Sequence, residues 1–284
     1  MKTLVNALII SVILSFTVFS QTFKFSRSIG NFKQATSFYI TSAGILYVTD
    51  GGTNEIYKLD TLGNVLKYTG GFGWDEGQFD TPSDVFANPL SVYVCDKNNS
   101  RVESFDKDLN YVSSLHTRNS DNKDERFGYP LSCALSQQGD LYILDSENKR
   151  IVKFDLFGNF VQNFGGYDAG SYALSKPKQL AVSLDNKVYV LDGKRIIVFD
   201  QYGNNLNSIN LNIDFIGIRI LFNNLTLTSP GSIYYSDLRN PDLGFNKLTL
   251  EGISGSIEII NSLIFNGKLY LLTADKILIL REKR

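Results

Sequence analysis

Four aspartates recur at the ends of similar apolar runs, at Asp50, Asp96, Asp145 and Asp192. Carboxylates are ligands that calcium prefers, so a ring of these residues would be a candidate metal site. A residue repeated at one strand end is explained more simply as a local cap, which accepts hydrogen bonds from the N–H groups of its own loop. We therefore interpret the recurring aspartates as structural and expect no metal site.

Catalytic residues are scarce in this chain. His116 is the only histidine, which excludes a zinc site built from several histidines and leaves one candidate base for a Ser-His-Asp arrangement. It follows the strand-like segment YVSSL and precedes a polar loop, a position typical of a surface histidine. We identify no catalytic residue in the sequence.

Two long Gly-rich segments carry aromatic and acidic residues. The first, GGFGWDEGQFDTP, contains the only tryptophan, Trp74, together with Asp75 and Phe79. The second, GGYDAGSYALSKP, contains Tyr167 and Tyr172. Aromatic rings beside acids and glycines suit a pocket for a carbohydrate, a peptide or a partner surface. The alternative is that both segments only pack neighbouring units, which predicts that Trp74 and Tyr167 are buried.

The elements that position these residues are copies of one repeat. Its aligned second-strand residues recur at intervals of between 37 and 49 residues, at Tyr47, Tyr93, Tyr142, Tyr189, Thr226 and Tyr270. A third strand follows each of them, and four copies then continue into TLGN, KDLN, LFGN or QYGN turns, where Gly and Asn tolerate a left-handed backbone. Another strand precedes each aligned residue. Six copies of four strands predict an all-β fold, a six-bladed β-propeller.

The two ends of the chain are expected to meet in the last blade. The sixth copy stops after its third strand, and residues 22–29 (TFKFSRSI) form a strand without a partner in the first copy. We expect this strand to complete the sixth blade, which removes free sheet edges.

Because neighbouring strands alternate in direction, the connectors between blades share a face with the loops between second and third strands. The opposite face carries short turns, which we interpret as scaffold.

The segments YVCDKNNSRVESFD and LYILDSENKRIVKFDLFGN resemble the NHL-repeat β-propellers, including secreted or periplasmic bacterial members. In that family an Asp ends a strand, an Asn stands three residues on and a basic residue five on. The matching residues are Asp96, Asn99 and Arg101 in one copy and Asp145, Asn148 and Arg150 in the next. We expect these residues to be structural. The resemblance implies a propeller and, because one fold hosts many functions, no particular activity.

The first residues and the composition predict an exported protein. Lys2, the apolar residues 4–19 and Ser20 form a secretory signal peptide, residues 1–20. The mature chain, residues 21–284, is expected to be a single propeller domain without a transmembrane segment. A net charge of -1 without a basic block argues against nucleic acid as the partner. Cys95 and Cys133 are too few for a disulfide scaffold, and we expect them to be unpaired, although an oxidising compartment would allow a bond.

These observations favour a monomeric, secreted or periplasmic binding or scaffolding module that has no cofactor. It would recognise a protein, peptide or carbohydrate through its inter-blade loop face. The alternative is a metal-dependent hydrolase similar to the gluconolactonase-like propellers, in which carboxylates and amides hold a divalent cation such as calcium in the central channel. No ligand motif of that family matches this sequence residue by residue.

Overall fold

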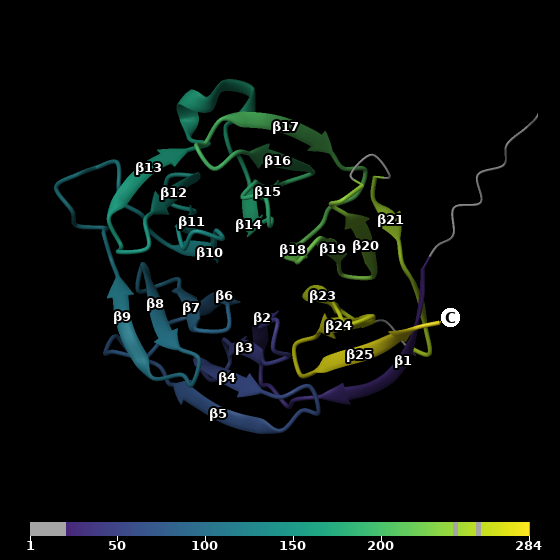
Figure 1. Cartoon of the computed structure of the whole chain (residues 1–284). Coiled ribbons are helices and arrows are strands. Elements are labelled where there is room, and N and C mark those ends of the chain that lie inside the picture. The colour runs from purple at the N-terminus through teal and green to yellow at the C-terminus, as the bar shows by residue number, and fades with distance from the viewer. Residues whose placement is uncertain (1–20, 241–243, 254–256, 284) are drawn as a thin grey trace, which may run out of the picture.

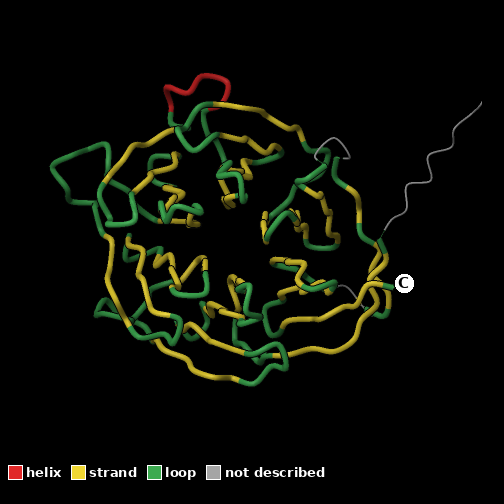
Figure 2. The backbone as a smooth tube through the Cα atoms, viewed as in Figure 1, coloured by secondary structure: helices red, strands yellow, loops and turns green. Residues whose placement is uncertain are grey.

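The strands form six sheets around a central axis (Figure 1), as the repeat predicts. The computed structural model describes residues 21–240, 244–253 and 257–283, so the predicted signal peptide lies outside the described residues. Figure 2 shows how strands dominate this part, with a short 3-10 helix, η1 (Tyr167–Tyr172), at the rim. Within the described ranges, no helix is long and apolar enough to cross a membrane.

Blades one to five are antiparallel four-stranded sheets in which the chain runs from the innermost to the outermost strand. Blade one contains β2 (Ala35–Ile40), β3 (Leu46–Asp50), β4 (Glu55–Leu59) and β5 (Val65–Gly70). Blade two contains β6 (Pro82–Ala87), β7 (Ser91–Asp96), β8 (Arg101–Asp106) and β9 (Tyr111–Leu115). Blade three contains β10 (Pro130–Leu135), β11 (Leu141–Asp145), β12 (Arg150–Phe154) and β13 (Phe160–Phe164). Blade four contains β14 (Pro177–Val182), β15 (Val188–Asp192), β16 (Arg195–Phe199) and β17 (Asn205–Asn210). Blade five contains β18 (Gly217–Leu221), β19 (Asn224–Ser229), β20 (Ser232–Asp237) and β21 (Asn246–Lys247).

Blade six joins the two ends of the described chain. It contains β23 (Asn261–Phe265), β24 (Lys268–Leu272), β25 (Ile277–Glu282) and β1 (Thr22–Ile29). β1 is antiparallel to β25, which confirms that the N-terminal strand closes the ring. β22 (Thr249–Glu251) adds a fifth strand, parallel to β1. This strand was not predicted, because its three residues carry no alternating apolar pattern long enough to be recognised.

Two of the aligned tyrosines, Tyr47 and Tyr142, pack in the same way. Tyr47 and Tyr142 are buried between neighbouring blades, and each hydroxyl donates to a carbonyl in a turn of the next blade. Tyr47 donates to Lys107 O at 2.5 Å and Tyr142 to Gln201 O at 3.5 Å. A tyrosine fits this position because its ring fills apolar space while its hydroxyl reaches a polar partner. In blades one and three, the aligned tyrosine therefore joins the blade to its neighbour as well as forming part of its own sheet.

The two cysteines lie between blades two and three. Cys95 of β7 and Cys133 of β10 are both free and buried. Burial raises the pKa of the Cys95 thiol well above its ordinary value. They pack with Phe127 and Phe154 in an apolar cluster, so both act as small core residues here.

Candidate functional site

The recurring aspartates fasten the end of each connector to the blade that it enters. Asp50 accepts hydrogen bonds from the backbone N–H groups of Lys33 and Gln34, at 2.6 and 2.8 Å. Asp192 accepts an equivalent bond from Lys176 N at 2.6 Å. All four carboxylates are buried at separate blades, so the structure does not assemble them into one ligand set.

The motif asparagines hold the same carboxylates from within their own loops. Asn99 Nδ2 donates to Asp96 at 2.7 Å, and Asn148 Nδ2 donates to Asp145 at 2.8 Å. Asn99 Nδ2 also lies 2.8 Å from Gly73 O of the first Gly-rich connector. The motif therefore ties the loop between second and third strands to the connector beside it.

An arginine at the start of the third strand clamps the connector backbone. Arg101 donates to Trp74 O at 2.9 Å and to Gln78 O at 2.7 Å, while its Nε pairs with Asp96 at 2.8 Å. The same kind of clamp occurs at the starts of β12 and β16, from Arg150 and Arg195. Arg195 was not identified from the sequence, because the shorter loop of blade four places it three residues after its aspartate rather than five.

The clamped first connector presents aromatic rings to solvent. Trp74 is 70% exposed and Phe72 is 64% exposed, and the two rings meet edge to face at 6.0 Å. Asp75 lies beside them and is exposed. Phe79 differs from our expectation, because it is buried against Phe105 at 6.0 Å and belongs to the core rather than to a binding surface.

The second Gly-rich connector forms η1. Tyr167 is fully exposed, whereas Tyr172 is half-buried and packs against the apolar cluster of blades three and four. η1 lies beside β13 and β17 at the rim, while the first connector joins β5 to β6 (Figure 1). The structure therefore places Trp74 and Tyr167 on two separate connectors and does not combine them into one pocket.

A buried glutamate lies beneath the first connector. Burial raises the pKa of Glu103 to about 7, although the charge of Arg101 opposes this shift. Glu103 Oε1 lies 3.1 Å from the Arg101 guanidinium and 3.4 Å from Gly77 N, and its Oε2 has no hydrogen-bond partner among the described residues. This buried carboxyl group, which accepts a hydrogen bond from Gly77 N–H of the connector, is therefore protonated more readily than an ordinary glutamate.

A buried polar network closes the central channel. Asp84 accepts hydrogen bonds from Ser37 Oγ at 2.6 Å and from Ser132 Oγ at 2.5 Å. The Arg219 guanidinium pairs with Asp84 and also contacts Ser37 Oγ. Gln179 Nε2 lies 3.4 Å from the same carboxylate. These residues come from the innermost strands of blades one to five and lie far apart in the sequence.

A sequence signal for this network lies in the proline-led strands, although the repeat pattern alone did not reveal it. Three innermost strands begin with proline, and the channel residue stands two positions later, as in Pro82–Asp84, Pro130–Ser132 and Pro177–Gln179. In each case a β-bulge separates the proline from the channel residue. A bulge changes the direction of the following side chain, and proline is tolerated at the first position of a strand.

Arg219 occupies the axial region in which a central metal would need ligands. Its side chain is 2% exposed and makes a buried ion pair with Asp84. Gly217 leaves room for the network, since a Cβ there would lie 3.3 Å from Gln179 Oε1 and 3.5 Å from Asn261 Oδ1. Across the described residues, no three His, Cys, Asp or Glu side chains form a group that could hold a metal.

Known proteins resemble both the repeat and the whole ring. A model of the NHL repeat matches residues 127–154, which include β10, β11 and β12 of blade three. Protein brain tumor of Drosophila melanogaster is 32% identical over 143 residues, which cover 49% of this chain and 13% of that protein. The structure of a streptogramin B lyase matches with a TM-score of 0.62 and 14% identity, covering 91% of this chain and 96% of that chain. The chain is a six-bladed β-propeller that contains an NHL repeat.

The proteins similar to this NHL propeller include one that is named as a probable lyase, and the match covers only part of its length. The probable peptidyl-alpha-hydroxyglycine alpha-amidating lyase pgal-1 of Caenorhabditis elegans is 28% identical over 122 residues, covering 40% of this chain and 35% of that protein. The chain thus spans well under two thirds of the curated relatives that it matches. At 14% identity, the likeness to the streptogramin B lyase shows the fold alone. The single histidine of this propeller, His116, is exposed directly after β9.

Proposed function

We propose that this NHL propeller is an exported, non-catalytic binding module that recognises a protein, peptide or carbohydrate. It would do so through its connector face, which is the face that carries the loops between blades. The observation that carries the proposal is the exposed Phe72–Trp74 pair on a connector whose backbone Arg101 holds in place. A ring that is exposed while its backbone is fixed offers contact area with little loss of conformational entropy on binding. Aromatic residues of this kind dominate the binding energy of many interfaces.

Trp74 supports a direct test because it is the only tryptophan in the chain. Residues 21–284 would be screened on peptide and glycan arrays, and each ligand found would be titrated while the tryptophan emission is followed. We expect an emission change on binding and at least about tenfold weaker binding of Trp74→Ala, which corresponds to about 1.4 kcal/mol.

Tyr202→Ala is the matched control. Tyr202 is 68% exposed in a turn on the opposite face, so its removal deletes a comparable aromatic ring away from the connectors. We expect this variant to bind like the unmodified protein. Ligands that bind Trp74→Ala as tightly as the unmodified protein would show that recognition does not use this connector.

A further inference from the structure

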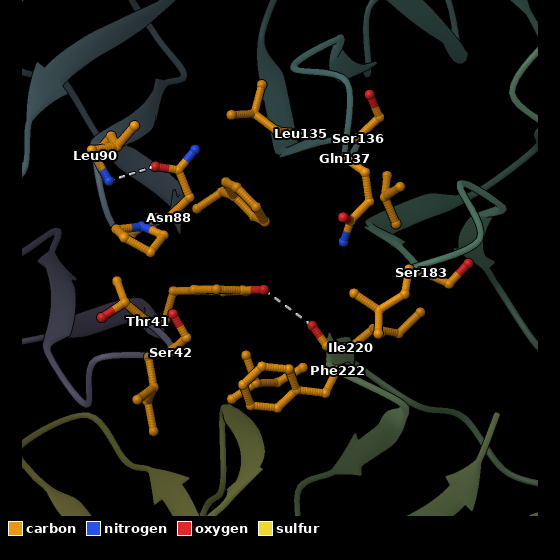
Figure 3. A pocket seen from close by; sticks show the side chains of 18 residues that line it. Thr41, Ser42, Asn88, Leu90, Leu135, Ser136, Gln137, Ser183, Ile220 and Phe222 are labelled. Carbon is orange, nitrogen blue, oxygen red and sulfur yellow. Dashed lines mark hydrogen bonds between the residues drawn. The ribbon is translucent and has the colours of Figure 1, made fainter. Parts of the chain in front are cut away.

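The face that we interpreted as scaffold contains a cavity at the mouth of the central channel. Its volume is about 410 Å³, and it lies within the ring of turns that join the first and second strands of blades one to five (Figure 3). The apolar side chains around it include Tyr39, Phe86, Leu135, Val182, Ile220 and Phe222. This size and this lining are typical of a pocket for a small organic molecule.

Among the described residues that line the cavity, none carries a carboxylate, ammonium or guanidinium group. Gln137 extends its side-chain amide over the opening, and Ser42 lies at the opposite side of the mouth (Figure 3). The Tyr39 hydroxyl proton is used within the protein, because it donates to Ile220 O at 3.1 Å. Such a lining favours a ligand without net charge, since a buried charge without a partner is costly.

The floor of the cavity adds a buried donor. A void of about 10 Å³ shares Tyr39, Phe86, Val182 and Ile220 with the cavity, and Arg219 also lines this void. The guanidinium pairs with Asp84 and Ser37, but its buried Nε has no hydrogen-bond partner in the described part of the chain. An unsatisfied buried donor is unfavourable, and an acceptor oxygen placed here would satisfy it.

Apolar side chains at the rim remain in solvent. Leu90 is 77% exposed, Leu184 is 44% exposed and Phe222 is 42% exposed, and all three line the cavity. Covering this surface would remove apolar area from water, which is favourable at roughly 25 cal/mol per Å². Because the cavity is concave and closed below by the polar network, a compact molecule can cover the rim and fill the interior together.

We propose that this channel mouth binds a neutral organic molecule with an aromatic or alicyclic body and one acceptor oxygen, such as a ketone or ester carbonyl. The apolar body lies among Tyr39, Phe86 and Phe222, and the oxygen points toward Arg219. This site is independent of the connector face, because the two lie at opposite ends of the innermost strands. Loss of one function therefore leaves the other intact.

The environment-sensitive dye 6-propionyl-2-dimethylaminonaphthalene is a suitable probe because it is neutral, aromatic and carries a ketone. Titration of residues 21–284 with this dye is expected to give a saturable blue shift of its emission. N-phenyl-1-naphthylamine has a similar apolar body without a carbonyl. We expect it to bind at least about tenfold more weakly, since it cannot satisfy the buried donor.

Two neighbouring turn residues give a matched pair of variants. Ser42 and Ala43 are both exposed in the same turn, but only Ser42 lines the cavity. Ser42→Trp is expected to block the mouth and weaken dye binding at least about tenfold, whereas Ala43→Trp is expected to bind normally. Phe222→Asn removes an apolar rim residue at a position with φ +57°, which Asn tolerates, so this variant should fold and bind less dye.

The proposal would be overturned by the absence of saturable dye binding to the unmodified protein, by equal effects of Ser42→Trp and Ala43→Trp, or by equal affinity for the two dyes. Dye binding to Trp74→Ala tests whether the dye occupies the channel mouth or the connector face. Dye binding that Trp74→Ala abolishes would place the dye on the connector face and would also contradict the proposal.

Discussion

Deletion of residues 21–30 is expected to open the propeller ring and lower the thermal midpoint by about 10 °C or more. The deletion removes β1, and therefore also the pairing of β1 with β25 and with β22. It also removes the buried side chains Phe23 and Ile29. Burial of each such side chain contributes about 1.5–3 kcal/mol, and for a chain of this size each kcal/mol corresponds to about 2–4 °C.

Two substitutions in β1 test the same closure without removing the strand. Phe23 is 2% exposed and Phe25 is 37% exposed on the same strand. Phe23→Ala is expected to cost about 3–5 kcal/mol in urea unfolding, and Phe25→Ala less than about 1 kcal/mol. An unchanged midpoint after the deletion, or equal costs for the two substitutions, would show that β1 does not close the ring.

Arg219→Ala is expected to destabilise the protein by about 3–5 kcal/mol, because it leaves the buried Asp84 carboxylate without its counter-ion. Arg239→Ala is the matched control. Arg239 pairs with Asp237 at 2.7 Å, but its side chain is 67% exposed, and such surface pairs contribute about 0–1 kcal/mol. Urea unfolding of both variants measures the difference.

Replacing both partners separates the ion pair from simple packing. The double variant Asp84→Leu and Arg219→Met leaves no unpaired charge, so it should recover much of the stability that Arg219→Ala loses. A loss in Arg219→Ala no larger than that in Arg239→Ala would mean that water or a neighbouring group compensates Asp84. The channel would then not be closed by this ion pair.

The fold could be predicted because its determinants repeat. Residues such as Tyr47 and Tyr142 occupy equal positions in successive blades, and the N-terminal strand had no other place to pair. β22 escaped recognition because its pairing to β1 depends on the closed ring rather than on a local pattern. A repeated pattern therefore predicts the strands that occur in every blade, but it does not predict a strand such as β22 that occurs in only one blade.

The site was harder to predict because exposure and channel contacts depend on the assembled ring. Trp74 and Phe79 share one Gly-rich segment, yet the first is exposed and the second is buried. Asp84 and Arg219 lie 135 residues apart and meet only when blades two and five face each other across the channel. Arg219 also differs in type from the serines of the network, so no repeated residue indicated its role.

Thermal unfolding of residues 21–284 in EDTA, and then in excess calcium, zinc or manganese, tests whether this NHL propeller functions as a binding module without a metal in its channel. We expect the same midpoint in all four conditions, because Arg219 lies in the channel and the recurring aspartates are committed to backbone amides. A cation at about 100 times its dissociation constant would add about 2.7 kcal/mol to stability. A higher midpoint with any one of these cations would contradict a metal-free channel and favour a metal-dependent hydrolase.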